Sequence, residues 1–213
     1  MRHRWIVTAA LCALCAAGLA AADFWQTKPY TGWSEKEVEQ MLSDSPWARK
    51  LSVVIQMPPR ESGDSGDRGG RGFGMPAPQL KMTLTWRSAP PVRQALARSD
   101  KSGATVIDGQ PFLERPPDYL LALSNVPGYL RGSLPAAAKT SFLRRGQKAA
   151  IPLRQGAIQQ GRGGTLTLVF AFPRTDPITL DDKEVEFITT LGTLEIKQKF
   201  KLKDLVVNGE LEL

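Results

Sequence analysis

Residues 193–213 read TLEIKQKFKLKDLVVNGELEL, and apolar and polar side chains alternate along most of this stretch. Alternation with a period of two is typical of a β-strand that buries one face. The pattern predicts one strand over residues 193–207. Asn208 and Gly209 then predict a two-residue hairpin turn, because both tolerate the positive φ that such a turn requires. Residues 210–213 are expected to form a short return strand.

The polar face of this strand carries a row of four lysines, namely Lys197, Lys199, Lys201 and Lys203. Neighbouring lysines in an extended row lie about 7 Å apart. Such a row is a candidate anion-binding site for a polyanion or an acidic lipid headgroup. The alternative, which the usual behaviour of charged strands favours, is a solvated face that discourages aggregation, with Glu210 and Glu212 neutralising part of its charge.

Strand patterns also occur throughout the rest of the chain. Alternation at residues 51–57 and 80–86 predicts two half-buried strands that pair with each other. Further strands are predicted at residues 119–124, 149–153, 165–172 and 185–190. Helical patterns are short and peripheral, one of them beginning at Pro90, and no β-α-β alternation occurs. The chain is therefore predicted to be mainly β with minor α, as an antiparallel β-sandwich or open barrel of about eight strands with a short N-terminal helix.

The N-terminal helix has the clearest local signals. Ser34 and Glu37 have the spacing of a capping box, in which each side chain accepts a hydrogen bond from a backbone N–H of the first turn. Trp33 and Val38 have the spacing of a hydrophobic staple. A helix over residues 35–44 is predicted, ending before proline because the residue before proline avoids helical angles.

Residues 1–22 are predicted to be a signal peptide. A basic start, RHR at residues 2–4, precedes an apolar stretch, and AAA at residues 20–22 provides the small residues of a cleavage site. The alternatives are an uncleaved anchor and a lipid-modified cysteine, and a leucine before each cysteine argues against the second. Cleavage after Ala22 predicts an exported protein, periplasmic or secreted, with no integral membrane span left.

The only histidine, His3, and both cysteines, Cys12 and Cys15, lie inside this leader. A cleaved chain therefore has no imidazole and no thiol, which excludes serine-histidine-acid triads, thiol nucleophiles and the usual zinc sites. No catalytic, cofactor-binding or metal-binding residue is predicted, and no cofactor is expected. Cleavage also lowers the formal charge of +7 by two, which leaves a moderately basic protein.

The cleaved chain is predicted to be a single domain in three parts. Residues 23–57 hold the capped helix and the first strand, residues 58–78 form a loop, and residues 79–213 form the β-rich remainder of the same domain. The loop contains six glycines and four prolines, and its lack of aliphatic side chains predicts disorder. Its arginine-glycine sequence is typical of segments that bind single-stranded nucleic acid, but an exported linker is favoured, so no nucleic-acid partner is expected.

Carboxylate chemistry remains open to the cleaved chain. The densest acidic cluster comprises Asp176, Asp181, Asp182, Glu184 and Glu186. A turn entering a strand is expected there, with its carboxylates in solvent. The aromatic-rich opening, residues 24–47, is able to stack on sugar rings, but anchoring of the N-terminal helix to the sheet explains it at least as well and is favoured.

Two stretches resemble a family of proteins. Residues 24–47, FWQTKPYTGWSEKEVEQMLSDSPW, and residues 172–213, with FPRTDP, DKEVEF and KFKLKDLVVNGELEL, are similar to an uncharacterised family of exported bacterial proteins. The resemblance implies an exported two-part protein and no known activity. The expected function is a non-enzymatic envelope or secreted protein with a binding or structural role, whose partner is an anionic cell-envelope polymer or another envelope protein. The alternative is a carboxylate-dependent or metal-dependent hydrolase acting on polysaccharide.

Overall fold

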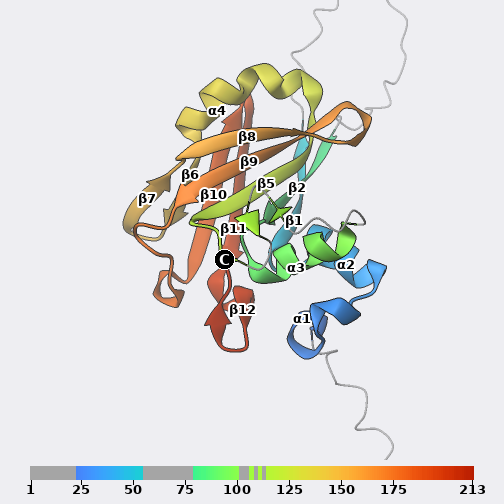
Figure 1. Ribbon diagram of the computed structural model, residues 1–213. Helices are drawn as coiled ribbons and strands as arrows, with labels where there is room; N and C mark the ends of the chain where they lie inside the picture. Colours follow the sequence, from blue (N-terminus) through green and yellow to red (C-terminus); the bar gives the residue numbers. More distant parts are fainter. Residues whose placement is uncertain (1–22, 55–78, 101–105, 108–109, 112–113) are drawn as a thin grey trace, which may run out of the picture.

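The computed structural model describes residues 23–54, 79–100, 106–107, 110–111 and 114–213 (Figure 1). The predicted leader, residues 1–22, and the predicted loop, residues 58–78, lie outside these residues, as do the last three positions of the strand expected at 51–57.

A five-stranded antiparallel sheet forms one layer, in the order β1-β2-β5-β9-β8. Its strands are β1 (Ala48–Val54), β2 (Gln79–Trp86), β5 (Asp118–Pro127), β8 (Gln155–Gln160) and β9 (Thr165–Pro173). The expected pairing of the first two strands is confirmed, with Leu51 opposite Met82.

A four-stranded antiparallel sheet forms the other layer, in the order β11-β10-β6-β7. Its strands are β6 (Phe142–Arg145), β7 (Lys148–Pro152), β10 (Glu184–Leu191) and β11 (Leu194–Lys201). The chain passes from the edge strand of this sheet, β7, to the edge strand of the other sheet, β8, within three residues. One side of the sandwich therefore presents both of these edges, and at the other side β1 contacts β11.

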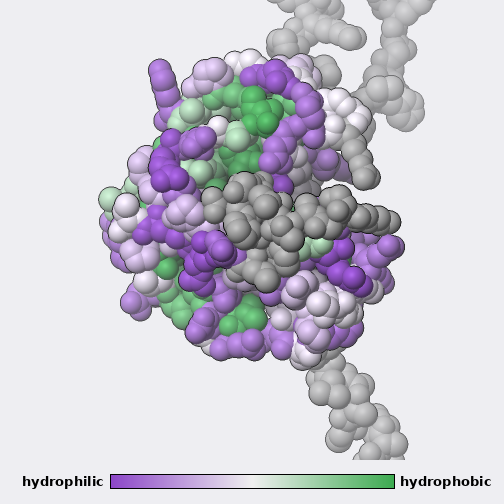
Figure 2. All heavy atoms as spheres, viewed as in Figure 1, coloured by the Kyte–Doolittle hydropathy of each residue, from purple (hydrophilic) through white to green (hydrophobic). Residues whose placement is uncertain are grey.

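Short helices and two small hairpins complete the described chain. The helices are α1 (Phe24–Thr27), η1 (Tyr30–Gly32), α2 (Glu35–Ser43), α3 (Pro90–Ser99), η2 (Gly128–Ser133), α4 (Leu134–Thr140), η3 (Arg162–Gly164), η4 (Leu180–Asp182) and η5 (Leu202–Leu205), where η denotes a 3-10 helix. The hairpins pair β3 (Val106–Ile107) with β4 (Gln110–Pro111) and β12 (Val206–Val207) with β13 (Glu210–Leu211). Beside α4, apolar side chains reach the surface above β8 (Figure 2).

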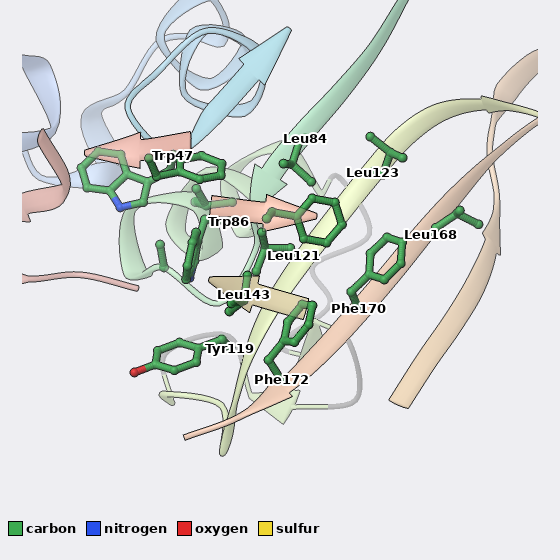
Figure 3. Packing of buried hydrophobic residues seen from close by; sticks show 14 of the residues in the cluster. Trp47, Leu84, Trp86, Tyr119, Leu121, Leu123, Leu143, Leu168, Phe170 and Phe172 are labelled. Atoms are coloured by element: carbon green, nitrogen blue, oxygen red, sulfur yellow. The ribbon is translucent and has the colours of Figure 1, made fainter. Parts of the chain in front are cut away.

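Aromatic side chains join the two sheets. Trp86 of β2 meets Phe200 of β11 edge to face with ring centroids 5.4 Å apart, and Phe170 of β9 meets Phe187 of β10 at 5.1 Å. Figure 3 shows the contribution of β2, β5 and β9 to this core, with Leu84, Leu121, Leu123, Leu168 and Phe172 among the buried residues. The fold class is confirmed as mainly β and sandwich-like, and the described strands form open sheets with no closed barrel.

The predicted capping box at the start of α2 is present. The Ser34 hydroxyl accepts a hydrogen bond from the Glu37 backbone N–H, and the Glu37 carboxylate accepts one from the Ser34 backbone N–H. Lys28 adds an ion pair to Glu37 at 2.5 Å. The hydrogen bonds from Lys28 and Ser34 lower the pKa of Glu37 from 4.5 to about 2. Trp33 and Val38, expected as the staple, are both buried.

Because the pKa of Glu37 is lower in the folded chain, the stabilisation from its charged form is complete above pH 4.5 and is lost as the pH falls toward 2. Glu37→Gln is therefore expected to lower the melting temperature at pH 7 and to have a much smaller effect near pH 2. Thermal unfolding followed by circular dichroism across this range measures the difference. Glu39→Gln, an exposed change in the same helix, is the control, and a pH-independent effect of Glu37→Gln would contradict the prediction.

The C-terminal hairpin is confirmed, but the strand before it is interrupted. Asn208 and Gly209 have φ of 50° and 87°, as the predicted turn requires. The single strand expected over 193–207 is wrong, because β11 ends at Lys201 and the 3-10 helix η5 follows. A helical turn buries both Leu202 and Leu205, three residues apart, which a straight strand cannot do because its alternate side chains point to opposite faces.

Candidate functional site

Strand β11 buries its apolar side chains and exposes its lysines, as the sequence predicts. Its buried residues are Leu194, Ile196 and Phe200, and its exposed lysines are Lys197, Lys199 and Lys201. The contact of Phe200 with Trp86 on the other sheet fixes which face of β11 points inward. Since β11 is the terminal strand of its sheet, its lysines lie on a face that a large ligand can approach.

The fourth lysine does not belong to the strand. Lys203 lies in η5, so the prediction of four lysines in one extended row is corrected to three on β11 and one in the turn that follows. The backbone N–H of Leu202 donates to the carbonyl of Lys183 at 2.9 Å, which holds the turn against the start of β10. Lys203 remains exposed.

Carboxylates from β10 and β11 neutralise half of the predicted row. Lys199 donates to Glu184 at 2.6 Å, and this hydrogen bond raises the pKa of Lys199 above 10.5. Lys197 pairs with Glu195 at 2.8 Å. Both contacts are between exposed side chains, so each contributes little to stability.

Glu210 and Glu212, which the sequence predicts to neutralise part of the lysine row, do not pair with these lysines. Glu210 has no ion pair with another described residue, and Glu212 pairs with Arg115 at 3.0 Å. Burial raises the pKa of Glu212 against the opposing effect of Arg115.

Three lysines gather where β10 begins and β11 ends, and we call them the basic end of β11: Lys183, Lys201 and Lys203. All three are exposed, and none forms an ion pair with another residue in the described part of the chain. Lys201 lies opposite Glu184, whose carboxylate is taken by Lys199. Lys201 and Lys203 are therefore the part of the lysine row that is still able to bind an anion, and Lys183 adds a third positive charge beside them. Sequence analysis missed Lys183, since only strand pairing brings it here.

The basic end adjoins a polar hollow of about 530 Å³. Lys203 and Arg49 line this hollow together with the carboxylates of Asp23, Asp44 and Asp204. The hollow thus holds three carboxylates beside two cations, so it attracts an anion less strongly than the exposed lysine face of β11 does.

The acidic cluster is partly buried, contrary to the expectation that it is solvated. Asp182 and Glu186 are 9% and 8% exposed. Each has a cation from a neighbouring strand, with Lys148 of β7 at 2.7 Å from Asp182 and Arg144 of β6 paired with Glu186. Burial raises the pKa of Asp182, but hydrogen bonds from Lys148 and the Thr179 N–H outweigh it and bring the pKa below 3.8. The fold tolerates the burial of these two carboxylates because each one pairs with a basic residue on β6 or β7.

A second buried pair belongs to a hollow of about 430 Å³ on the outer face of the five-stranded sheet. Asp118, 4% exposed, pairs there with Arg154. In the same way Asp176 pairs with Arg145 at 2.5 Å, and this hydrogen bond lowers the pKa of Asp176. These carboxylates face cations rather than each other, whereas acid-base hydrolysis of a glycosidic bond requires two carboxyl groups converging on one substrate.

The aromatic opening anchors the N-terminal helices. Phe24 stacks edge to face on Trp25 at 4.9 Å and on Trp33 at 5.1 Å, and Trp25 on Trp47 at 5.8 Å. Trp47 is fully buried, and its indole N–H donates to the Glu212 carbonyl at 2.6 Å. These contacts support the anchoring interpretation over sugar stacking for Trp33 and Trp47.

Within the described ranges, no three histidine, cysteine, aspartate or glutamate side chains are placed to hold a metal ion. None of the described helices is long and apolar enough to cross a membrane. The fold and the site thus define an open antiparallel β-sandwich with a basic end on one edge strand. No known protein family, curated protein or solved structure compared with this chain matches it.

Proposed function

We propose that this chain is a non-enzymatic exported protein, of the cell envelope or secreted, that binds an anionic envelope polymer through the basic end of β11. The predicted leader supports export, as does the resemblance to exported bacterial proteins. The observation that carries the binding role is the set of three exposed lysines without carboxylate partners in the described chain, Lys183, Lys201 and Lys203.

The chemistry of the basic end suits an extended polyanion. Its ammonium groups are hydrated point charges on exposed side chains, of which only Lys203 also lines the polar hollow, so they attract negative charge without selecting one ligand geometry. Binding of this kind is weak for each contact and gains strength when a polymer presents many anionic groups. It also weakens as salt rises, because exposed charges are screened within about 10 Å at 0.1 M ionic strength.

The test compares two double variants of equal charge. Lys201→Gln/Lys203→Gln is expected to bind immobilised polyphosphate about tenfold more weakly than the unmodified protein at low salt, and to elute at lower salt. Lys36→Gln/Lys139→Gln removes two exposed lysines from α2 and α4 and is expected to bind like the unmodified protein. Salt-gradient elution measures both, with neutral dextran as the matrix control.

Equal weakening by both double variants would show that only net charge matters and would remove the basic end as the site. Retention on neutral dextran would show that the protein binds a ligand other than an anion. Circular dichroism of each variant checks that the fold is retained.

A further inference from the structure

Strand β8 is an edge strand with an open side. It pairs with β9 alone, so its other side has no partner strand among the described residues and presents a row of backbone N–H and C=O groups. Its sequence, QGAIQQ, contains no charge and no proline. Ile158 is 42% exposed, which makes it one of the few large apolar side chains on the described surface.

The other three sheet edges carry residues that discourage strand pairing. β1 has Arg49 and Lys50, β7 has Lys148 and Pro152, and β11 has its lysines. Lysine and proline on edge strands oppose the addition of another strand, through charge and through the missing N–H. Among the four edges of the two main sheets, such residues are absent only from β8, so this edge differs from the other three in the property that controls pairing.

The surroundings of β8 suit an added strand. Ile158 lies opposite Leu168 of β9, on the side of the sheet that faces the core. A hollow of about 170 Å³ opens beside it, and Leu134 and Ala138 of α4 line the hollow with Leu168 and Phe170. Figure 2 shows the apolar area between α4 and β8. Side chains of a strand added at this edge would cover both Ile158 and the hollow.

We propose that β8 pairs antiparallel with β8 of a second copy of this chain, joining the two five-stranded sheets into one across a two-fold axis. A two-fold axis perpendicular to the sheet places residues of the same face opposite each other. The residues that face each other across the two β8 strands are therefore only glutamine, glycine, alanine and isoleucine. The same operation at β11 would bring lysines against lysines, which is destabilising. Among the four edges, β8 is therefore the one suited to a second copy of a chain that is basic both with its predicted leader and without it.

A cysteine scan tests the pairing directly. Single cysteines are placed at each position of Gln155–Gln160 in a chain carrying Cys12→Ser and Cys15→Ser. A two-fold pair places one residue directly opposite its own copy, with Cα atoms about 5 Å apart, which is within disulfide reach. Residues one position away are too far from their own copies. We expect disulfide-linked dimers to peak at one position of β8 and to fall on both sides, whereas equal yields at all six positions would overturn the proposal.

Sedimentation equilibrium provides the second test. The unmodified chain is expected to dimerise, and Ile158→Lys to raise the dissociation constant at least tenfold. Val54→Lys, at a position 49% exposed on the opposite edge strand of the same sheet, is expected to leave it unchanged. A monomer at all concentrations, or a dimer equally sensitive to both changes, would overturn the proposal. An unchanged dimer in a folded Ile158→Lys variant would do the same.

Salt separates this interface from the basic end of β11. Two copies with the same net charge repel each other, so added salt is expected to strengthen the dimer while it weakens polyanion binding. The variant Lys201→Gln/Lys203→Gln should dimerise normally, and Ile158→Lys should still bind polyphosphate as a monomer.

Discussion

Replacing Phe187 by alanine is expected to lower the free energy of unfolding by about 4 kcal/mol. Phe187 is fully buried on β10 and meets two rings of β9, Phe170 at 5.1 Å and Phe172 at 6.2 Å, both edge to face. These contacts cross from one sheet to the other. Truncation would remove the transfer energy of the ring, leave a cavity between the layers and lose both aromatic contacts.

Chemical denaturation followed by tryptophan fluorescence measures this loss. Phe187→Leu retains much of the volume and is expected to lose about half as much free energy as Phe187→Ala. Val54→Ala, at an exposed edge position, is the control and should change the free energy of unfolding by about 0.5 kcal/mol or less. A loss below about 1 kcal/mol for Phe187→Ala would mean that the sheets do not depend on this contact.

Local signals predicted the parts of the fold that depend on neighbours in the sequence. The α2 helix follows from Ser34 and Glu37, which cap each other within one turn. The β12–β13 hairpin follows from Asn208 and Gly209, whose positive φ is a property of those residue types. In each case the energy that selects the structure acts across a few residues, so a single sequence reveals it.

Two strands of the main sheets, β8 and β6, were not predicted because their patterns depend on tertiary contacts. β8 reads QGAIQQ and has only one large apolar side chain, since it is an exposed edge whose structure comes from pairing with β9. β6 contains Arg145, which is only 1% exposed and donates to the carbonyls of Asp176 and Ala149. In a sequence, an arginine that will be buried in a strand cannot be distinguished from one that faces solvent, because its hydrogen-bond partners are distant in the chain.

The candidate site was predicted in part. Alternation revealed the lysines of β11, but not the carboxylates of β10 that lie opposite them. The missing signal is Gly192, whose φ of 62° closes a two-residue turn between Leu191 and Leu194. That turn fixes the register and brings Glu184 opposite Lys201. Recognising Gly192-Thr193 as a hairpin turn would have predicted that Glu184 and Glu186 lie opposite Lys201 and Lys199, but not which basic residue each carboxylate pairs with.

Removal of the Lys148 ammonium group by Lys148→Met is expected to destabilise the chain by about 2 kcal/mol at neutral pH. Its partner, Asp182, has a side chain that is only 2% exposed, and Lys148 reaches it at 2.7 Å. Without this cation the carboxylate keeps the Thr179 N–H at 2.9 Å but stays buried with its charge uncompensated. The expected loss of stability is smaller than that for a fully buried ion pair because the Lys148 side chain is 47% exposed.

The dependence on pH identifies the cause of this loss. In the unmodified chain the pKa of Asp182 is below 3.8, so the pair stabilises the fold above that pH and the stabilisation is lost as the pH falls. In Lys148→Met, burial is expected to raise the pKa of Asp182, so protonation should relieve the penalty, and the two proteins should converge in stability as the pH falls through the lowered pKa of Asp182 in the unmodified chain.

Asp182→Asn separates the charge from the packing at this position. The amide oxygen still accepts a hydrogen bond from the Thr179 N–H, so adding Asp182→Asn to Lys148→Met is expected to recover part of the lost stability at pH 7. Urea denaturation of the four proteins in the double-mutant cycle measures the coupling between Lys148 and Asp182. Strictly additive losses that do not vary with pH would show that Lys148 contributes through packing of its alkyl chain rather than through charge.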